Sequence, residues 1–300
     1  MKRALPVWRS LLYVPAHVDK FVAKAHLRGA DCILLDLEDS VPAAEKEAAR
    51  ARVEAASKSV RRGGADVMIR INRSLALAVR DIESCVGPDV DGFMIAKTES
   101  ASHVRLLEDH IAEVELHRGL PVGHSKLIVL VESASAWPEL GAIAKASERI
   151  VGVSMGSEDF ALDCGMEANT ETLLLPKQQL VHAAAAAGVL PLGLVGSNTD
   201  FGDAAGFRAN VERSKRYGFG GASCIHPQQV PILNEVFCPS ADELSRAERI
   251  VAALTAAQQQ GRGAVSVDGK MVDAPVARNA QRVLARHAAI AARQARQLSM

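Results

Sequence analysis

The sequence predicts an α/β protein built as a TIM (β/α)8 barrel with a C-terminal helix–hairpin–helix appendage. A short apolar run followed by a polar tip recurs eight times along the chain, and helix-like segments follow most of these runs. Such alternation implies right-handed crossovers and a parallel sheet. Eight units within roughly 230 residues is the length expected of this barrel, and a doubly wound open sheet is the main alternative.

The predicted strands are rich in Val and Ile and are bounded by turn residues, which is typical of strands buried in a parallel sheet. In a TIM barrel the working residues lie where the strands end, so the polar tips are the places to search for a site. The predicted strands are Ser10–Val14, Cys32–Leu37, Asp66–Ile71, Gly92–Ala96, Lys126–Val131, Ile150–Met155, Val189–Val195 and Gly221–Ile225.

The segments between the strands carry helix signals. Pro42 and Pro176 suit the first turn of a helix, because proline lacks the N–H that would be unsatisfied there. Both are therefore predicted to start helices. The predicted helices include Val18–Leu27, Ala43–Val60, Trp137–Ser147 and Lys177–Ala187.

The last part of the chain departs from this repeat, and we expect a barrel domain over 1–239 and an appendage over 240–300. Ser240 is the predicted N-cap of the first helix in the appendage. The sequence Asp268-Gly269 between two short apolar runs is a strong signal for a two-residue hairpin. The segment is too small to hold its own core, so we expect it to pack on the barrel or on a neighbouring subunit. Its predicted elements are a helix over 241–259, the hairpin, and a helix from about Val276 to Arg296.

The composition excludes several classes of partner. Lys+Arg and Asp+Glu balance at 35 each, which gives no field for nucleic acid or an anionic membrane. No apolar run approaches a membrane span, the start is too poor in apolar residues for a signal peptide, and no P-loop or G-x-G-x-x-G spacing occurs. Five cysteines without a C-x-x-C pair indicate free thiols in a reducing cytoplasm.

Two acidic residues follow two consecutive predicted strands. Glu132 ends the run at Lys126–Val131, and Asp159 follows the run at Ile150–Met155. One β–α–β unit separates them, so the two carboxylates are expected side by side at the same face, where they repel unless a proton or cation lies between them. Each alone could instead cap a nearby helix. Together they favour a site for a hard divalent ion such as Mg²⁺, which leaves coordination positions for a substrate.

Other strand ends also carry polar groups. Arg70 could form a structural ion pair with Glu38 or Asp39, and it could also present a fixed fork to a developing oxyanion. Lys97 is more typical of a surface lysine. The remaining polar residues at strand ends are His17, Asp36, Asn72, Glu158, Ser197, Asn198 and His226.

Specific strings along the chain resemble the HpcH/HpaI aldolase family, and within it the branch similar to the citrate lyase β-subunit and to malyl-CoA and citramalyl-CoA lyases. The Leu-Asp-Leu-Glu-Asp string and the Ile-His-Pro-x-Gln string are specific when they occur together. The matching segments are Arg9–Pro15, Leu34–Pro42, Arg70–Asn72, Val131–Ser133, Gly156–Asp159, Cys224–Val230 and Asp268–Asp273. Two positions depart from the family pattern, with Ala16 where many relatives have Gly and Ser157 where Ala is common.

The resemblance implies a TIM barrel and Mg²⁺ (or Mn²⁺) chemistry that breaks a C–C bond in 3-hydroxyacyl thioesters, giving a keto acid and an acyl thioester. The thioester would be carried by CoA or by an acyl carrier protein. The family's metal ligands fall on Glu132 and Asp159, and its substrate-facing catalytic arginine falls on Arg70. Further substrate contacts are expected from Glu38, Gly156, Ser157 and Glu158.

The resemblance also implies that the appendage folds over a neighbouring subunit of a trimer or hexamer and delivers an acid to its active site. The matching residue is Asp273, with Asp268 as a second candidate; Asp273 could instead cap the last helix. Two alternative functions stay open. One is a thioester hydrolase on the same scaffold, and the other is a citrate lyase β-subunit that works on an acyl carrier protein within a larger complex.

Overall fold

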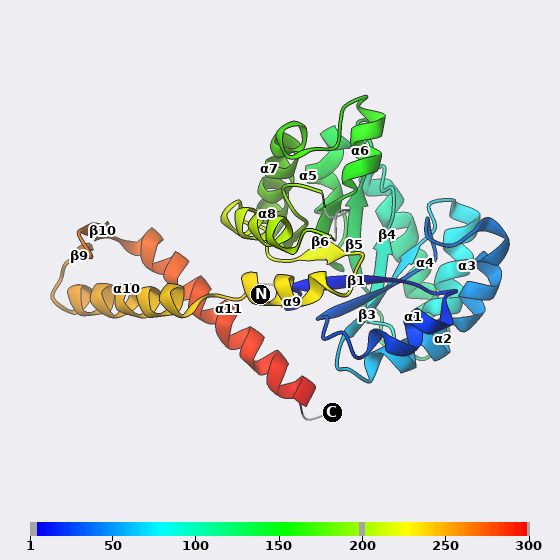
Figure 1. Cartoon of the computed structure of the whole chain (residues 1–300), viewed down its shortest axis with the longest axis horizontal. Coiled ribbons are helices and arrows are strands. Elements are labelled where there is room, and N and C mark those ends of the chain that lie inside the picture. Colours follow the sequence, from blue (N-terminus) through cyan, green and yellow to red (C-terminus); the bar gives the residue numbers. More distant parts are fainter. Residues whose placement is uncertain (1–4, 198–201, 299–300) are drawn as a thin grey trace. The chain divides into compact units, whose positions relative to one another are not determined.

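The computed structural model describes residues 5–197 and 202–298. The chain divides into two compact units, Met1–Phe237 and Cys238–Met300. In the first unit, strands and helices alternate along the chain, with the strands at the centre and the helices around them (Figure 1). No helix in the described part of the chain is long and apolar enough to span a membrane.

Eight parallel strands form the sheet of the first unit in the order β7-β6-β5-β4-β3-β2-β1-β8. β1 pairs with both β2 and β8, and a parallel bridge from Leu192 to Gly221 joins the two ends of the sheet. The closed barrel is therefore confirmed, and the doubly wound alternative is wrong. The strands are β1 (Ser10–Pro15), β2 (Cys32–Asp36), β3 (Asp66–Ile71), β4 (Gly92–Ile95), β5 (Lys126–Val131), β6 (Ile150–Met155), β7 (Leu190–Leu192) and β8 (Ala222–Cys224).

The helices of the barrel correct two sequence predictions. Pro176 lies inside α7 and does not start it, because the helix begins six residues earlier, at Thr170. Asn169 forms a capping box there, accepting hydrogen bonds from the amides of Glu171 and Thr172. Pro42 precedes a short 3-10 turn, η1 (Ala43–Glu45), before α2 begins. The helices of this unit are α1 (Asp19–Ala25), α2 (Lys46–Arg61), α3 (Leu75–Cys85), α4 (Ala101–His117), η2 (Trp137–Glu139), α5 (Leu140–Ile143), α6 (Ser157–Asp163), α7 (Thr170–Ala187), α8 (Ala204–Arg216) and α9 (Gln229–Val236).

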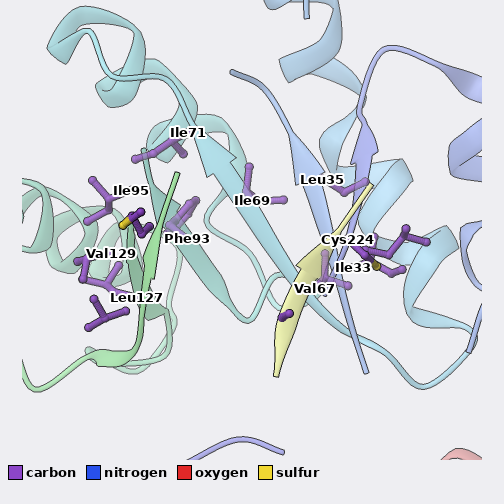
Figure 2. Close-up of a cluster of buried hydrophobic side chains, with 14 of the residues drawn as sticks. Ile33, Leu35, Val67, Ile69, Ile71, Phe93, Ile95, Leu127, Val129 and Cys224 are labelled. Atoms are coloured by element: carbon purple, nitrogen blue, oxygen red, sulfur yellow. The ribbon is translucent and has the colours of Figure 1, made fainter. Parts of the chain in front are cut away.

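Alternation along the strands divides the apolar side chains into two layers. One cluster packs between the strands and the helices, and it includes Ile33, Leu35 and Ile69 (Figure 2). The second cluster consists of the residues in between and fills the barrel interior, as Leu34 and Met68 do. Because successive side chains point to opposite faces of a strand, the same register decides which residues reach the barrel mouth.

The second unit has the predicted helix, hairpin and helix. Ser240 caps α10 (Ala241–Gln259) in a capping box with Glu243, and this sequence prediction is confirmed. The hairpin of β9 (Val265–Val267) and β10 (Lys270–Val272) turns at Asp268 and Gly269, both with positive φ, as a primed turn requires. The last helix, α11, spans Ala274–Leu298.

The expectation that this unit holds no core of its own is wrong. A small apolar cluster forms within it, from residues of α10, β10 and α11. Its buried members are Ala247, Ile250, Leu254, Val272, Ala277 and Ala280.

Candidate active site

The inner face of the barrel changes from apolar to polar at the carboxyl ends of the strands. Arg70 follows Met68 on the inner face of β3, and Glu132 follows Leu130 beyond β5. These residues border a cavity of about 360 Å³. The same cavity is lined by Tyr13, Asp36, Ser154, Gly156, Ser157, Glu158, Asp159 and Lys177. The polar mouth of the barrel is therefore a concave site with charges of both signs.

Glu132 is a nearly buried carboxylate beside a second acid. Its side chain is 5% exposed, and its Oε1 accepts a hydrogen bond of 3.1 Å from the amide of Lys97. Burial, together with the neighbouring Asp159, raises the pKa of Glu132 to about 8. β5 and β6 are paired neighbours, which is why the two acids lie together as the sequence predicts.

The capping role that the sequence left open for each acid does not fit the structure. Glu132 accepts from Lys97, whose amide lies after β4 and not at a helix start. Asp159 lies inside the first turn of α6, and the N-cap position there is occupied by Gly156 without a side-chain cap. A Cβ added at Gly156 would lie 2.6 Å from Oε2 of Glu132, so only glycine leaves the carboxylate its present position.

The acid pair fits a hard divalent cation. The ionised form of a buried carboxylate beside a second acid needs positive charge nearby, and oxygen ligands are those that Mg²⁺ prefers. No group of three or more His, Cys, Asp or Glu side chains that could hold a metal occurs among the described residues. Glu132 and Asp159 would therefore supply two ligands, with water or substrate oxygens completing the set. A second cavity of about 280 Å³ also borders both carboxylates.

Arg70 is held by Asp36 in a bidentate ion pair. Its Nε and Nη2 donate to the two carboxylate oxygens at 2.7 and 2.6 Å, and its Nη1 lies 3.2 Å from Oε2 of Glu38. The guanidinium also stacks on the ring of Tyr13, 4.8 Å from its centroid. The sequence predicted an ion pair with Glu38 or Asp39 but missed Asp36 as the main partner. The result is a fork whose position is fixed at the cavity wall.

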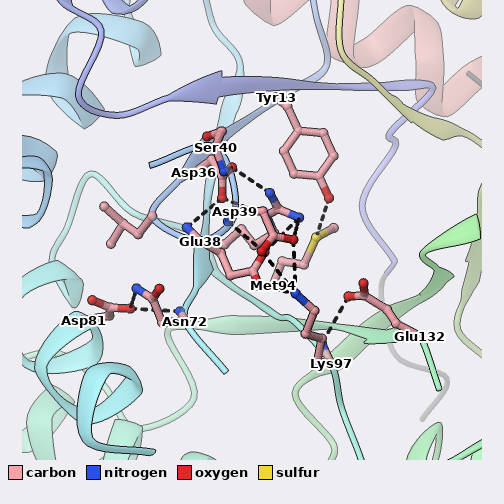
Figure 3. Close-up of polar contacts among 12 residues, drawn as sticks. Tyr13, Asp36, Glu38, Asp39, Ser40, Asn72, Asp81, Met94, Lys97 and Glu132 are labelled. Carbon is pink, nitrogen blue, oxygen red and sulfur yellow. Dashed lines mark hydrogen bonds and ion pairs between the residues drawn. The ribbon is translucent and has the colours of Figure 1, made fainter. Parts of the chain in front are cut away.

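Lys97 belongs to this network, so its interpretation as a surface lysine is wrong. Its Nζ donates to Oε1 of Glu38 at 2.7 Å and to both oxygens of Asp39 at 3.1 Å (Figure 3). Lys97 has a φ of 47°, which is uncommon for a residue with a side chain. That turn aims its amide at Glu132. Burial raises the pKa of Glu38, and this residue contacts Arg70 and Lys97.

The segment after β6 carries three of the predicted substrate contacts. Glu158 is exposed at the cavity rim, where its Oε1 accepts from Ser197 at 3.0 Å. Ser157 accepts a hydrogen bond of 2.7 Å from Nζ of Lys177. Lys177 was missed as a site residue because the sequence placed it in the first turn of a helix, where a lysine is ordinarily exposed. The substrate roles of Gly156, Ser157, Glu158 and Glu38 stay predictions.

Asp273 and Asp268 lie in the second unit. Oδ1 of Asp273 accepts from the amide of Val276 at 3.2 Å, so it does cap α11. Asp268 forms an exposed ion pair of 2.9 Å with Arg249. A capping aspartate keeps its second oxygen, so the cap does not conflict with an acid–base role.

Two further polar residues at the strand ends do not border the cavity. His17 is not among the residues that border it, and His226 accepts from the amide of Gln228 within its own turn. Asn198 lies outside the described residues.

A closed barrel with an acid pair and a fixed arginine in one cavity at its mouth is the arrangement expected of an enzyme of the aldolase type. The chain belongs to the HpcH/HpaI aldolase/citrate lyase family, whose model matches residues 9–227. It is 34% identical over 279 residues to citrate lyase subunit beta from Leuconostoc mesenteroides subsp. cremoris, covering 92% of this chain and 92% of that protein.

Two further relatives extend the comparison. The mitochondrial citramalyl-CoA lyase of Homo sapiens is 31% identical over 290 residues, covering 91% of this chain and 83% of that protein. Among solved structures, CitE from Mycobacterium tuberculosis in complex with magnesium, acetoacetate and coenzyme A has a TM-score of 0.75 and 29% identity. That likeness covers 96% of this chain and 100% of the CitE chain.

Proposed function

We propose that this chain is a Mg²⁺-dependent carbon–carbon lyase that cleaves 3-hydroxyacyl thioesters of the malyl-, citramalyl- or citryl-CoA type to a keto acid and an acyl thioester. One observation carries the proposal. A single cavity brings the acid pair Glu132 and Asp159 together with Arg70, whose guanidinium is fixed by Asp36. Relatives that are citrate lyase subunits or citramalyl-CoA lyases support the reaction class.

The acid pair is the proposed metal site. Bound there, Mg²⁺ (or Mn²⁺) would orient and polarise the oxygens of the hydroxy- or keto-acid part. Glu132 and Asp159 would hold the ion, and the magnesium in the CitE complex supports this assignment. The amide of Lys97 holds Oε1 of Glu132, so Oε2 would be the oxygen that faces the ion.

Arg70 is the proposed electrophilic group. In cleavage a base takes the proton of the substrate hydroxyl, which becomes the carbonyl of the keto acid as the C–C bond breaks. The electron pair of that bond moves onto the thioester part as an enolate. A guanidinium fixed at the cavity wall stabilises negative charge where it develops on the enolate oxygen. Asp36 positions the fork but does not have to touch the substrate. A proton then goes to the enolate carbon to complete the acyl thioester.

Asp273 from a neighbouring subunit is the proposed source of that proton, within a homo-oligomer such as a trimer or hexamer. Asp273→Asn keeps an oxygen for the helix cap but cannot transfer a proton, so we expect turnover to fall at least about a hundredfold with the fold intact. Asp268→Asn is the matched control and should keep its activity.

Mixed oligomers give a sharper test of the neighbour's role. Arg70→Ala and Asp273→Asn should each be inactive alone. Unfolded together and refolded as mixed oligomers, they should regain part of the wild-type activity, because some sites combine an intact Arg70 with a neighbour's intact Asp273. If the mixture stays inactive although mixed oligomers form, Asp273 does not act on a neighbour.

The reaction class itself is tested by a product screen. Malyl-, citramalyl- and citryl-thioesters on CoA and on an acyl carrier protein are incubated with Mg²⁺, and keto acid and free thiol are scored separately. A lyase gives keto acid without thiol, whereas thiol without keto acid would show the hydrolase. Unchanged Mg²⁺-dependent turnover in both Glu132→Ala and Asp159→Ala would refute the metal assignment.

The carrier protein remains a second candidate for the thioester carrier, favoured by the similarity to citrate lyase β-subunits. Copurification with a small acyl carrier protein and activity only on its thioester would support it. The five free cysteines fit the reducing cytoplasm that we propose as the compartment.

A further inference from the structure

Lys177 is a buried cation at the wall of the cavity. The residue is 3% exposed and lies in α7, one position after Pro176. Its Nζ donates to Oγ of Ser157 at 2.7 Å, which is its one hydrogen bond within residues 5–197 and 202–298. Burial lowers the pKa of Lys177 to about 8, so the side chain is still mostly charged at neutral pH.

Other buried cations of the barrel have fixed carboxylate partners. Arg9 pairs with Asp31 at 2.8 Å, and Arg149 pairs with Glu115 at the same distance. Lys177 has no such partner among the described residues, because none of their carboxylate oxygens lies within 4.0 Å of its Nζ. Glu158, whose charge acts to raise the pKa of Lys177, is exposed and accepts a hydrogen bond from Ser197.

The other cations around the cavity have carboxylate partners, and Lys177 differs from them in this respect. Arg70 is neutralised by Asp36 and Glu38, and Lys97 by Glu38 and Asp39. An ammonium group has three donors, and burying a charge is costly unless it is paired and hydrogen-bonded. The two remaining donors of Lys177 are best satisfied by an anionic group that enters the cavity.

The position of Lys177 indicates which part of the substrate carries this anion. Its partner Ser157 lies two residues before Asp159, on the same turn of α6. The cation therefore stands beside the proposed metal site, where the acid part of the substrate would bind. A phosphate of CoA is a poor candidate, because Lys177 is almost inaccessible from outside the cavity.

We propose that Lys177 binds a second carboxylate on the acid part of the substrate, so that the enzyme prefers thioesters whose cleavage releases a dicarboxylic keto acid. This inference rests on the proposed lyase function. Among the candidate substrates it selects the citryl type, which releases a dicarboxylic keto acid, over the malyl and citramalyl types, which release monocarboxylic ones. Lys177 is thus a specificity-determining residue in direct contact with the substrate.

Equilibrium binding tests the inference without catalysis. Malate and lactate are matched probes, because both are 2-hydroxy acids and malate adds one carboxylate to the methyl group. With Mg²⁺ present, calorimetry on the full chain should show malate binding at least about tenfold more tightly than lactate, as expected for hydrogen bonds between charged groups. Equal affinities for the wild-type protein would overturn the inference before any variant is made.

The variants then assign the preference to one side chain. Lys177→Gln should abolish the preference for malate and leave the affinity for lactate unchanged, whereas Lys177→Arg should retain most of it. Lys126→Gln, at the start of β5 and thus at the opposite end of that strand from Glu132, is the matched control. If Lys177→Gln weakens both acids equally, Lys177 only supports Ser157 and the inference is wrong.

Kinetics separate this inference from the proposed function. The specificity constant kcat/KM of Lys177→Gln should fall at least about tenfold for a citryl thioester and much less for a citramalyl thioester. Cleavage of both thioesters with equal losses would refute the inference and leave the lyase intact. If the preference for malate depends on Lys177 but no thioester is cleaved, Lys177 still binds a carboxylate and the proposed lyase function is wrong.

Discussion

Replacing Asp36 by Asn tests whether the Arg70 clamp is as important as its geometry indicates. Asp36 is 1% exposed and binds Arg70 through hydrogen bonds of 2.7 and 2.6 Å. It also accepts from the amides of Glu38 and Ser40. Asn keeps the size of the side chain but offers one oxygen in place of two, and its NH₂ group faces other donors.

These contacts give the expected loss in the free energy of unfolding. Removing one partner of a buried ion pair costs about 3–5 kcal/mol, and the second partner Glu38, 3.2 Å from Arg70, moderates the loss to about 3 kcal/mol. Urea unfolding at pH 7 measures this difference. Turnover should also fall at least about tenfold, because a displaced guanidinium no longer faces the enolate oxygen.

The stability difference between wild type and Asp36→Asn should depend on pH in a defined direction. Burial alone would raise the pKa of Asp36, but the hydrogen bonds and the charge of Arg70 outweigh it and hold the pKa below its ordinary value of 3.8. A carboxyl with a lowered pKa in the folded state adds stability that is fully present above the unfolded pKa. The difference in unfolding free energy between wild type and Asp36→Asn should therefore be constant near neutral pH. It should shrink below about pH 4, where the unfolded carboxyl takes up a proton before the folded one does, and be lost as pH falls through the folded pKa.

Asp39→Asn is the control for this experiment. Asp39 has a side chain that is 54% exposed and lies 4.0 Å from Arg70, so its loss should cost less than about 1 kcal/mol. If Asp36→Asn unfolds at the same urea concentration as the wild type, or loses no more stability than Asp39→Asn, Asp36 does not hold the guanidinium of Arg70 in place.

Two further predictions concern the metal site and the appendage. Gly156→Ala should keep the fold, because the atoms nearest the added methyl belong to the side chain of Glu132 and not to backbone, but it should weaken Mg²⁺ binding at least about tenfold by displacing that carboxylate. Calorimetric titration checks this, with Gly141→Ala, where the methyl meets open space, as the control; equal Mg²⁺ affinities would contradict it. Ser240→Ala should destabilise α10 by about 1 kcal/mol through loss of the cap, whereas Ser245→Ala in the helix interior should not. Hydrogen exchange of the first-turn amides measures both, and unchanged protection in Ser240→Ala would argue against the cap.

The acid pair could be located from the sequence because two local signals determine its position. Continuous apolar runs that are rich in Val and Ile and bounded by turn residues show where β5 and β6 run. The strands of consecutive β–α–β units are neighbours, and their ends meet at one face. Glu132 and Asp159 then have to lie close together. The same reasoning identified Arg70 as a residue of the barrel mouth, but not its partner.

The partner of Arg70 is decided by strand register. In the pairing of β2 with β3, Asp36 lies directly opposite Arg70, and both side chains point into the barrel. Glu38 and Asp39, which the sequence favoured, lie beyond the end of β2 and reach Arg70 at 3.2 and 4.0 Å. Register depends on contacts between different strands, and Asp36 and Arg70 are 34 positions apart in the sequence. A local sequence pattern therefore does not predict that they pair.

The sequence did not predict Lys177 as a site residue because it placed the start of α7 too late. Proline at a first turn is a good rule, but α7 begins earlier, at the capping box of Asn169, and tolerates Pro176 inside it. That places Lys177 in the second turn, on the side of the helix that packs against the barrel. The signals that could have revealed it were the Asn169 cap with Thr172 three residues later.

By itself the sequence determined the strands, most helices, the caps of the appendage and the two acids, because each depends on neighbours along the chain or on the next β–α–β unit. Only the tertiary structure decided the charge balance of the site. The clamp of Asp36 on Arg70, the attachment of Lys97 to Glu38 and the burial of Lys177 depend on which distant side chains share one cavity. Electrostatic energy in a desolvated site depends on these distances and on access to water, and both arise only when the barrel closes.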